Sequence, residues 1–262
     1  MVAYDLHPDY FSTRWTLQQQ GIPPVGVQHH HAHIASCMAE NQRDGRVIGF
    51  SLDGTGYGAD GAVWGGEVLL ADYREFERAA HFAYVPMPGG AAAIHEPWRM
   101  GVSYLAQHFG GAFLDWKIPF VKHLDRRRAE TLLHMMERSV NSPLTSSCGR
   151  LFDAVAALAG IRQQVNYEAQ AAIELEMAIS EAGDDAYPLE ILDGENGWQI
   201  GTRPLFEAIV HDLRAGVDAG TISRRFHNGL VEIFARLAAR LRERTGLDRV
   251  CPSGGTFQNV YL

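Results

Sequence analysis

The stretch VIGFSLDGTGYGADGAVWGGEVLLADY, residues 47–73, most clearly indicates how this chain folds. Val47–Leu52 is a short apolar run typical of a buried strand, and it ends at an acidic residue, Asp53. A turn rich in glycine follows, and further strands are predicted over Ala62–Ala71 and Glu75–Ala83. The segment therefore predicts a β-hairpin with a glycine-rich connection, and not the strand-to-helix turn of a Rossmann dinucleotide site.

Helices and strands are also predicted on both sides of this hairpin. Before it, the sequence indicates an extended lead-in over residues 1–15, a helical turn at Thr16–Gln20, a strand at Val25–Gln28 and a helix at His29–Glu40. After it, we expect helices at Trp98–His108, Arg126–Arg138, Leu151–Ala157, Glu168–Glu181, Pro204–Ala215 and Ile222–Thr245, with strands at Tyr187–Asp193, Gly197–Thr202 and Asp248–Cys251. This mixture of elements predicts an α/β fold with mixed α and β content.

Composition excludes several classes of protein. The 262 residues carry a net charge of −8, which argues against broad binding of nucleic acid or of an anionic membrane. The sequence has no apolar run of 18 or more residues and no signal-peptide pattern, so no membrane span is expected. Three widely spaced cysteines, Cys37, Cys148 and Cys251, fit reduced thiols better than a disulfide scaffold. These features together predict a cytoplasmic protein.

The histidine cluster VQHHHAHIA, residues 27–35, suggests a metal site. In a helix, residues four apart share one face, so His29 and His33 would direct two imidazoles at one point. Neutral imidazole nitrogen is a common ligand of divalent metals. His30 and His31 would point elsewhere. The alternative is an ordinary histidine-rich surface helix.

Asp53 strengthens the metal interpretation. A carboxylate at the end of a strand can ligate or orient a cation, and glycines allow backbone amides to approach phosphate oxygens. A second strand-to-glycine loop occurs at Ser253-Gly254-Gly255, and two such loops facing each other clamp phosphates in actin-like ATPases. A P-loop is excluded because the chain has no GxxxxGK[ST] match. The alternative for the first loop is a tight hairpin in which glycines serve only the turn.

Three further segments have both a functional and a plain structural interpretation. The segment before Asp153, SSCGRLF, places small polar residues at a helix start, where anions are favoured, and Asp153 could accept hydrogen bonds from a ribose. An N-cap followed by a surface acid is the interpretation that the residues alone favour. Glu168 in NYEAQ suits the capping of a helix's first turn. The polar segment Asp5–Tyr10 could reach a site, or it could be a simple lead-in strand.

Taken together, seven ordered motifs resemble one family. They are VQHHHAHIASCMAE, SLDGTGYGADGAVWGGE, YVPMPGG with EPWRM, LTSSCGRLFDAVAAL, NYEAQAAIELE, FHNGL and SGGTFQN. The chain from Asp5 to its end is similar to the C-terminal carbamoyl-transfer region of the HypF hydrogenase-maturation carbamoyltransferases. The same core resembles threonylcarbamoyl-transfer proteins and antibiotic O-carbamoyltransferases, which share the fold of actin-like and sugar-kinase ATPases.

The resemblance implies a two-lobed fold and a set of site residues. It implies a first lobe over residues 1–145 and a partial second lobe over residues 146–262. It implies a divalent metal, iron or zinc, at His29, His33 and Asp53, with a further aspartate in a segment that this chain lacks. It implies ATP or carbamoyl-adenylate at a set of loop residues, which are Asp53, Gly54, Thr55, Gly56, Tyr57, Gly58, Gly149, Asp153, Ser253, Gly254, Gly255 and Asn259.

The implied activity is transfer of a carbamoyl group from carbamoyl-adenylate to the C-terminal cysteine of the partner HypE. No catalytic residue is assigned to this chain, because the acceptor thiol arrives on the partner. The acylphosphatase-like, zinc-finger and adenylation regions of the family are absent, so the chain is not expected to make carbamoyl-adenylate alone. The missing end of the domain would leave an exposed sheet edge, which could pair two copies.

Three alternatives stay open at this point. The first is a phosphotransferase of the sugar-kinase type on the same fold, although no catalytic base is identifiable near the loops. The second is an inactive folded fragment that only binds partners. The third is a zinc hydrolase, which would need a third ligand at a fixed spacing that the sequence does not offer.

Overall fold

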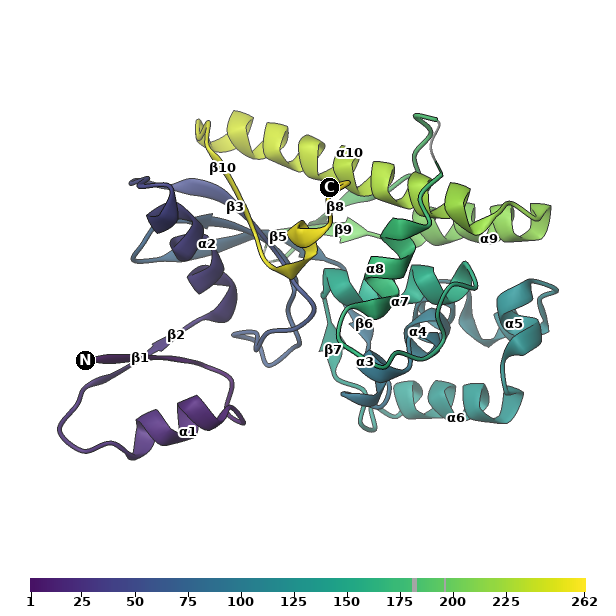
Figure 1. Ribbon diagram of the computed structural model, residues 1–262, viewed down its shortest axis with the longest axis horizontal. Helices are drawn as coiled ribbons and strands as arrows, with labels where there is room; N and C mark the ends of the chain where they lie inside the picture. Colours follow the sequence, from purple (N-terminus) through teal and green to yellow (C-terminus); the bar gives the residue numbers. More distant parts are fainter. Residues whose placement is uncertain (181–182, 196) are drawn as a thin grey trace.

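A six-stranded mixed sheet forms the centre of the computed structural model, which describes residues 1–180, 183–195 and 197–262 (Figure 1). In sheet order the strands are β10 (Val250–Ser253), β3 (Val47–Leu52), β4 (Gly66–Ala71), β5 (Phe76–Phe82), β9 (Gly197–Gly201) and β8 (Glu190–Gly194). β3, β4 and β5 are antiparallel neighbours, whereas β10 and β9 join β3 and β5 in parallel. The mixed α/β architecture predicted from the sequence is therefore confirmed.

Helix α2 (His29–Glu40) covers one face of this sheet, next to β10 and β3. The side chain of Gln28 caps it by accepting hydrogen bonds from the amides of His30 and His31. Ile34 and Met38 on its inner face are buried against the sheet. Gly49 of β3 permits this close packing, since a Cβ there would lie 2.7 Å from the Ile34 side chain. The predicted bounds of α2 and β3 are both confirmed.

The first 27 residues form a small unit that the sequence predicted poorly. β1 (Val2–Asp5) pairs in parallel with β2 (Pro24–Val27), and α1 (Phe11–Gln18) connects them. The predicted extended lead-in to residue 15 is therefore wrong after Asp5, and the helical turn expected at Thr16–Gln20 is the end of a longer helix that begins at Phe11 and ends at Gln18. α1 has no apolar stripe to reveal it, because its buried residues are the polar Thr13 and Thr16, while Phe11 is 83% exposed.

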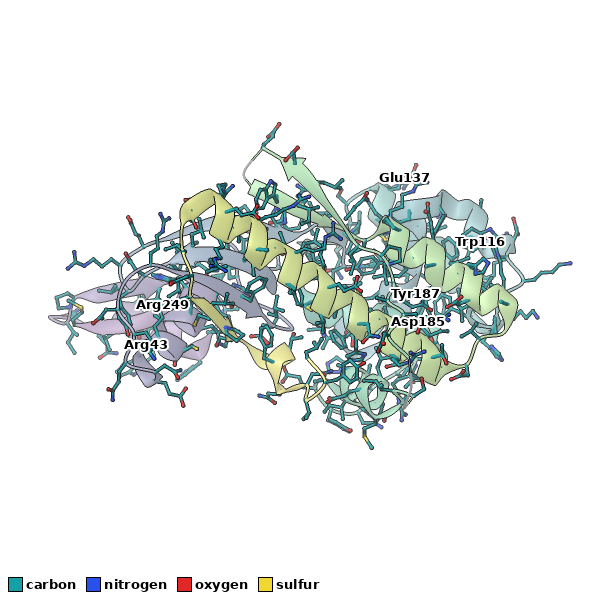
Figure 2. The ribbon with its side chains drawn as sticks, turned by 90° about the horizontal axis from the view of Figure 1, so that it is seen from above. Arg43, Trp116, Glu137, Asp185, Tyr187 and Arg249 are labelled. Atoms are coloured by element: carbon teal, nitrogen blue, oxygen red, sulfur yellow. The ribbon has the colours of Figure 1, made fainter. Side chains whose placement is uncertain are left out.

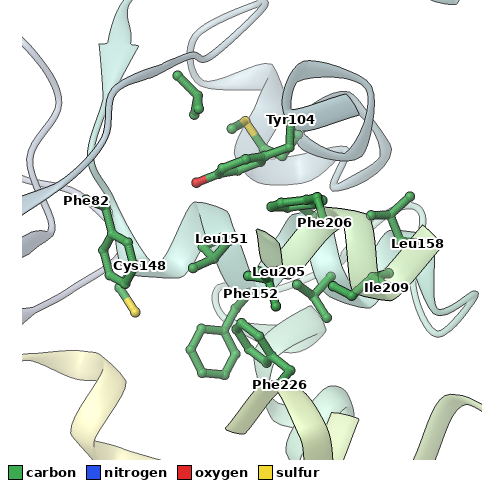
Figure 3. Close-up of a cluster of buried hydrophobic side chains, with 14 of the residues drawn as sticks. Phe82, Tyr104, Cys148, Leu151, Phe152, Leu158, Leu205, Phe206, Ile209 and Phe226 are labelled. Carbon is green, nitrogen blue, oxygen red and sulfur yellow. The ribbon is translucent and has the colours of Figure 1, made fainter. Parts of the chain in front are cut away.

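Helices fill the other half of the molecule, around a small two-stranded sheet of β6 (Val85–Pro86) and β7 (Leu144–Thr145). These helices are α3 (Ala92–His95), α4 (Trp98–Phe109), α5 (Pro119–His123), α6 (Arg126–Glu137), α7 (Cys148–Leu158), α8 (Gln170–Met177), α9 (Arg203–Ala215) and α10 (Ala219–Thr245), with 3-10 turns at Gly110–Asp115 and Gly255–Gln258. α7 is the central helix, and nearly all of its side chains are buried. Figure 3 shows Phe152 of α7 against Phe226 of α10, with ring centroids 4.9 Å apart.

The long helix α10 joins the sheet to this helical half (Figure 2). Its Phe234 packs edge-on against Phe50 of β3, at 5.6 Å between ring centroids. Near its other end, Arg225 forms ion pairs with Asp185 and Asp212, and the Tyr187 hydroxyl donates a hydrogen bond to Asp212 at 2.7 Å. The six-stranded sheet takes strands from both sides of residue 145, and the division into lobes at that residue stays a prediction.

Several predicted bounds need correction. The strand expected over Ala62–Ala71 begins only at Gly66, because Val63 forms isolated bridges to Tyr57 and Thr145 instead of extending β4. The helix expected over Glu168–Glu181 spans Gln170–Met177. Ala169 adopts a left-handed φ of 60° before it, which leaves Glu168 outside the helix. Glu181 lies outside the described residues.

The remaining differences are shifts at the ends of elements. The strand expected at Tyr187–Asp193 begins at Glu190, the strand expected at Asp248–Cys251 spans Val250–Ser253, and the helix expected from Leu151 begins at Cys148. None of the described helices combines the length and the hydropathy needed to cross a membrane.

Candidate metal and nucleotide site

Three side chains converge where α2 meets the end of β3. The Nε2 atom of His33 lies 3.2 Å from the Nε2 atom of His29 and 3.2 Å from Oδ2 of Asp53. The Nε2 atom of His29 lies 3.4 Å from the same Asp53 oxygen. One ligand atom from each residue lies within 4.8 Å of the other two. The structure therefore brings together the three residues that the sequence analysis singled out as metal ligands.

Electrostatics in this cluster favour an ionised carboxylate. Burial alone would raise the pKa of Asp53, but its contacts with the His29 and His33 imidazoles and the hydrogen bond from the Gly54 amide hold this pKa well below its usual range. The neighbouring Asp53 carboxylate raises the pKa of His29, against the opposing effect of burial. The Gly54 amide donates to Oδ1 of Asp53 at 2.8 Å. Oδ2 is therefore the Asp53 oxygen that faces both imidazoles.

The other two histidines of the cluster serve the packing of α2. His30 is fully buried beside Gln28, and burial lowers its pKa to about 4, so that the ring is neutral. His31 reaches the backbone oxygen of Asp72, 2.6 Å from its Nε2 atom. Among the described residues, neither imidazole makes a hydrogen bond with Asp53, whereas His29 and His33 both contact it.

The glycine-rich loop, Asp53–Gly58, folds over the start of α2. Gly54 and Thr55 are partly exposed, Gly56 and Gly58 are buried, and Tyr57 is exposed. The Gln28 side chain donates a hydrogen bond to the Tyr57 carbonyl at 3.2 Å, which ties the loop to the helix N-terminus. The loop and α2 therefore form one local unit around Asp53.

The N-terminus of α7 contacts the backbone of this loop. The Ser147 hydroxyl is 2.9 Å from the carbonyl of Asp53 and 2.8 Å from that of Gly54. The Gly149 amide donates to the Asp53 carbonyl at 3.2 Å. A Cβ at Gly149 would lie 2.8 Å from the Cα of Gly54, so glycine allows the two backbones to meet. Gly149 therefore contacts the backbone of the glycine-rich loop, and its contact with a nucleotide stays a prediction.

Asp153 is placed differently from the surface acid that the sequence analysis considered. Only 3% of it is exposed, and its Oδ2 atom lies 2.7 Å from Nε of Arg150 one turn earlier on α7. Burial raises the pKa of Asp153, and the adjacent Arg150 opposes this shift. The carboxylate is thus held inside the helical half, and its contact with a ribose stays a prediction.

The second glycine loop lies beside the first. β10 runs parallel to β3, with Ser253 opposite Ser51, so both strands end at the same edge. Gly254 has a φ of 101°, and a Cβ there would lie 2.3 Å from the Leu52 carbonyl oxygen. At Gly255 a Cβ would lie 3.0 Å from Oδ1 of Asp53. The two loops therefore flank Asp53, as their shared strand-to-glycine pattern predicted.

Asn259 is turned toward α10. Its side-chain amide lies 3.0 Å from Nε2 of His227, a buried histidine of the FHNGL motif. The Nδ1 atom of His227 lies 2.8 Å from the Ser223 carbonyl, which leaves Nε2 as the acceptor for Asn259. Oδ1 of Asn259 accepts the amides of Tyr261 and Leu262. Its predicted contact with nucleotide stays untested.

One contact in the site was not predicted. The Asp5 carboxylate lies 2.7 Å from Nδ1 of His29, on the ring edge opposite the Asp53 side. From the sequence alone, the polar segment around Asp5 is equally consistent with a simple lead-in strand. The only available signal was the density of polar side chains in DLHPDY.

Comparison with known proteins agrees with the fold and the motifs. Residues 49–262 match the family model described as Carbamoyltransferase, Kae1-like Domain, second subdomain, and residues 1–40 match the HypF Kae1-like domain. The carbamoyltransferase HypF of Synechocystis sp. is 36% identical over 100% of this chain, which covers 35% of that protein. A HypF homolog of Cupriavidus necator is 37% identical over 100% of this chain, which covers 68% of its length.

Solved structures show the same similarity. A crystal structure of full-length HypF in the phosphate- and nucleotide-bound form matches with a TM-score of 0.93 and 42% identity, over 99% of this chain and 40% of that one. The T. kodakarensis HypF structure matches with a TM-score of 0.88 and 32% identity, over 100% and 35% of the two chains. The chain thus spans about a third of the length of most of these relatives. It belongs to the family of HypF carbamoyltransferase Kae1-like domains.

Proposed function

We propose that this chain is the carbamoyl-transfer part of a HypF-type enzyme, which binds a divalent metal and a nucleotide and passes a carbamoyl group to the C-terminal cysteine of HypE. The nucleotide is ATP or carbamoyl-adenylate. The observation that carries the proposal is the convergence of His29, His33 and Asp53 between two glycine loops. Membership of the HypF family supplies the reaction class.

The donor set fits iron or zinc. Two imidazole nitrogens and one carboxylate oxygen are ligands that suit both metals. His29 and His33 would each supply Nε2, and Asp53 would supply Oδ2, because these are the atoms that face one another. When bound, the metal would act as a Lewis acid toward a phosphate or carbonyl oxygen of the ligand. The chain's own residues hold the carboxylate ionised and aim the two imidazoles at it.

The two glycine loops would hold the phosphate. The two loops, Gly54–Gly58 and Ser253–Gly255, lie on either side of Asp53, and their backbone amides would supply fixed dipoles for an anionic group, apart from those of Gly54 and Gly58, which already donate to Asp53 Oδ1 and to the Ala62 carbonyl. Burial raises the pKa of Cys148 and of Cys251 to about 12, which makes neither thiol a ready nucleophile. This agrees with an acceptor thiol that comes from the partner protein, and with the assignment of no catalytic residue to this chain.

Three accompanying expectations stay predictions. We expect the chain alone to bind ligands without making carbamoyl-adenylate, because it spans about a third of most of its relatives. We expect a cytoplasmic protein, since the cysteines are free thiols. β10 is an edge strand of the described sheet, so pairing of two copies along this edge is expected to appear in a solution size measurement.

The proposal is tested by titrating the chain with Zn²⁺ and with a non-hydrolysable ATP analogue in a calorimeter. His33→Ala should weaken Zn²⁺ binding at least about tenfold. The matched control is His134→Ala, which removes an exposed histidine of α6 and should bind Zn²⁺ like the unmodified chain. Equal Zn²⁺ affinity in both variants would contradict the proposed site. ATP-dependent phosphorylation of a small polyol would instead favour the sugar-kinase alternative.

A further inference from the structure

The contact between Asp5 and His29, which the sequence did not predict, makes the surroundings of His29 differ from those of His33. Oδ2 of Asp5 lies 2.7 Å from Nδ1 of His29, and both side chains are about three-quarters buried, with exposed fractions of 21% and 24%. An ionised carboxylate is only an acceptor, so Nδ1 of His29 must carry the proton in this pair. In the neutral ring, Nε2 is then left with its lone pair directed toward His33 and Asp53.

Asp5 is held in place by three separate contacts. β1 pairs in parallel with β2, and Asp5 lies opposite Val27. Val27 precedes the first residue of α2, His29, by two positions in the sequence, so this pairing holds Asp5 beside the start of α2. The amide of His7 donates to Oδ1 of Asp5 at 2.8 Å, which leaves Oδ2 for His29. The Thr13 hydroxyl of α1 donates to the Asp5 carbonyl at 2.7 Å. The whole small unit of β1, α1 and β2 thus fixes the carboxylate.

His33 lacks a matching carboxylate partner at Nδ1 in the part of the chain that the structure describes. Within residues 1–180, 183–195 and 197–262, no hydrogen bond is made by Nδ1 of His33, whereas its Nε2 atom contacts both His29 and Asp53. The hydrogen bond from Nδ1 to Asp5 therefore holds His29 with Nε2 facing the metal position, whereas no contact on Nδ1 among the described residues holds the ring of His33 in the same way.

We propose that Asp5 is a positioning residue of the metal site, which fixes the tautomer and the ring orientation of His29 so that Nε2 is presented to the metal. This rests on the proposed metal-binding function. The physical basis is general: a carboxylate behind a ligating histidine orients the ring and raises its basicity, and its loss costs on the order of tenfold to hundredfold in metal affinity.

The test compares Asp5→Ala, Asp5→Asn and Asp9→Asn in two measurements. The first is the tautomer of His29 in the metal-free chain, from two-bond ¹H–¹⁵N correlations of the ring. The second is Zn²⁺ affinity by calorimetry. Asp9→Asn is the matched control, because Asp9 lies in the same segment but its side chain is 74% exposed and forms an exposed ion pair with Arg14. Circular dichroism verifies that each variant is folded.

The unmodified chain and Asp9→Asn should show His29 protonated at Nδ1 and should bind Zn²⁺ equally. Asp5→Ala should show mixed His29 tautomers and a loss of affinity on the order of tenfold to hundredfold. Asp5→Asn keeps an acceptor oxygen, so it should retain the tautomer and lose less affinity. If Asp5→Ala perturbs β1, the Zn²⁺ affinity of Asp5→Asn decides the matter, because this variant preserves the shape of the side chain and removes the charge that raises the basicity of His29, so an unchanged affinity would refute the role of Asp5.

The two proposals fail in different ways. Asp5 variants with unchanged tautomer and unchanged Zn²⁺ affinity, beside a His29→Ala variant that loses binding, would refute the role of Asp5 and leave the metal site standing. A His29→Ala variant that binds Zn²⁺ as well as the unmodified chain would overturn the metal site itself, and the role of Asp5 with it.

Discussion

Gly149→Ala separates the loop-supporting role of Gly149 from an ordinary helical role. Gly149 lies in the first turn of α7 without a positive φ, so alanine by itself should stabilise that helix by roughly 1 kcal/mol. The added Cβ would, however, lie 2.8 Å from the Cα of Gly54. Carbon atoms prefer about 3.5–4.0 Å, so the loop backbone at Asp53–Gly54 must move by roughly 1 Å.

The expected changes in the free energy of unfolding and in ligand affinity follow from this displacement. Overpacking of this kind costs about 1–3 kcal/mol, so after the gain in helix propensity the free energy of unfolding should fall by no more than about 2 kcal/mol. The larger effect should be on the site, because Asp53 moves with the loop. A misplacement of about 1 Å should weaken Zn²⁺ and nucleotide binding on the order of tenfold to hundredfold.

Urea unfolding and calorimetric titration with Zn²⁺ measure the two effects. The control is Gly111→Ala, where a new Cβ would make only an ordinary contact with Leu133 at 3.6 Å. That variant should keep the stability and the Zn²⁺ affinity of the unmodified chain. The reasoning is refuted if Gly149→Ala is more stable by about 1 kcal/mol and binds Zn²⁺ with unchanged affinity, because the loop would then not rest on Gly149.

Three further predictions concern stability, measured by urea unfolding. Arg78→Ala removes the guanidinium that lies 2.5 Å from the fully buried Glu67 carboxylate, so the free energy of unfolding should fall by about 3–5 kcal/mol. The control Arg46→Ala breaks an exposed ion pair with Glu77 and should lower it by less than about 1 kcal/mol. Equal losses in the two variants would contradict this prediction. Burial lowers the pKa of His108 to about 4, so unfolding takes up a proton between pH 6.5 and 4, and stability should fall as pH falls through that range, by at most about 3 kcal/mol before solvent screening. His108→Gln should flatten this dependence, and an unchanged slope would count against it. Phe226→Ala should cost about 3–5 kcal/mol, because the ring is fully buried against α7, and a cost below about 1 kcal/mol would show a looser core.

The parts of the fold that the sequence predicted well have strong local signals. The bounds of α2 and β3 agree with the prediction, because Gln28 caps the helix and an uninterrupted apolar run marks the strand. The pairing of His29 and His33 follows from helical spacing alone. That Asp53 and the second glycine loop would lie beside them was inferred from strand ends, and the parallel pairing of β10 with β3 provides it.

The parts that were missed depend on contacts between distant segments. α1 buries Thr13 and Thr16 while exposing Phe11, so its sequence shows no helical stripe of apolar residues. The contact of Asp5 with His29 exists only because β1 pairs with β2, and no local pattern reveals that pairing. The burial of Asp153 likewise depends on the packing of α7 inside the helical half.

The most direct test of the central claim is a crystal of this chain soaked with Zn²⁺ and a nucleotide, with the metal located by anomalous scattering. We expect one strong peak within bonding distance of Nε2 of His29, Nε2 of His33 and Oδ2 of Asp53, with nucleotide phosphate between the two glycine loops. A peak bound elsewhere, with these three side chains still hydrogen-bonded to one another, would contradict the central claim.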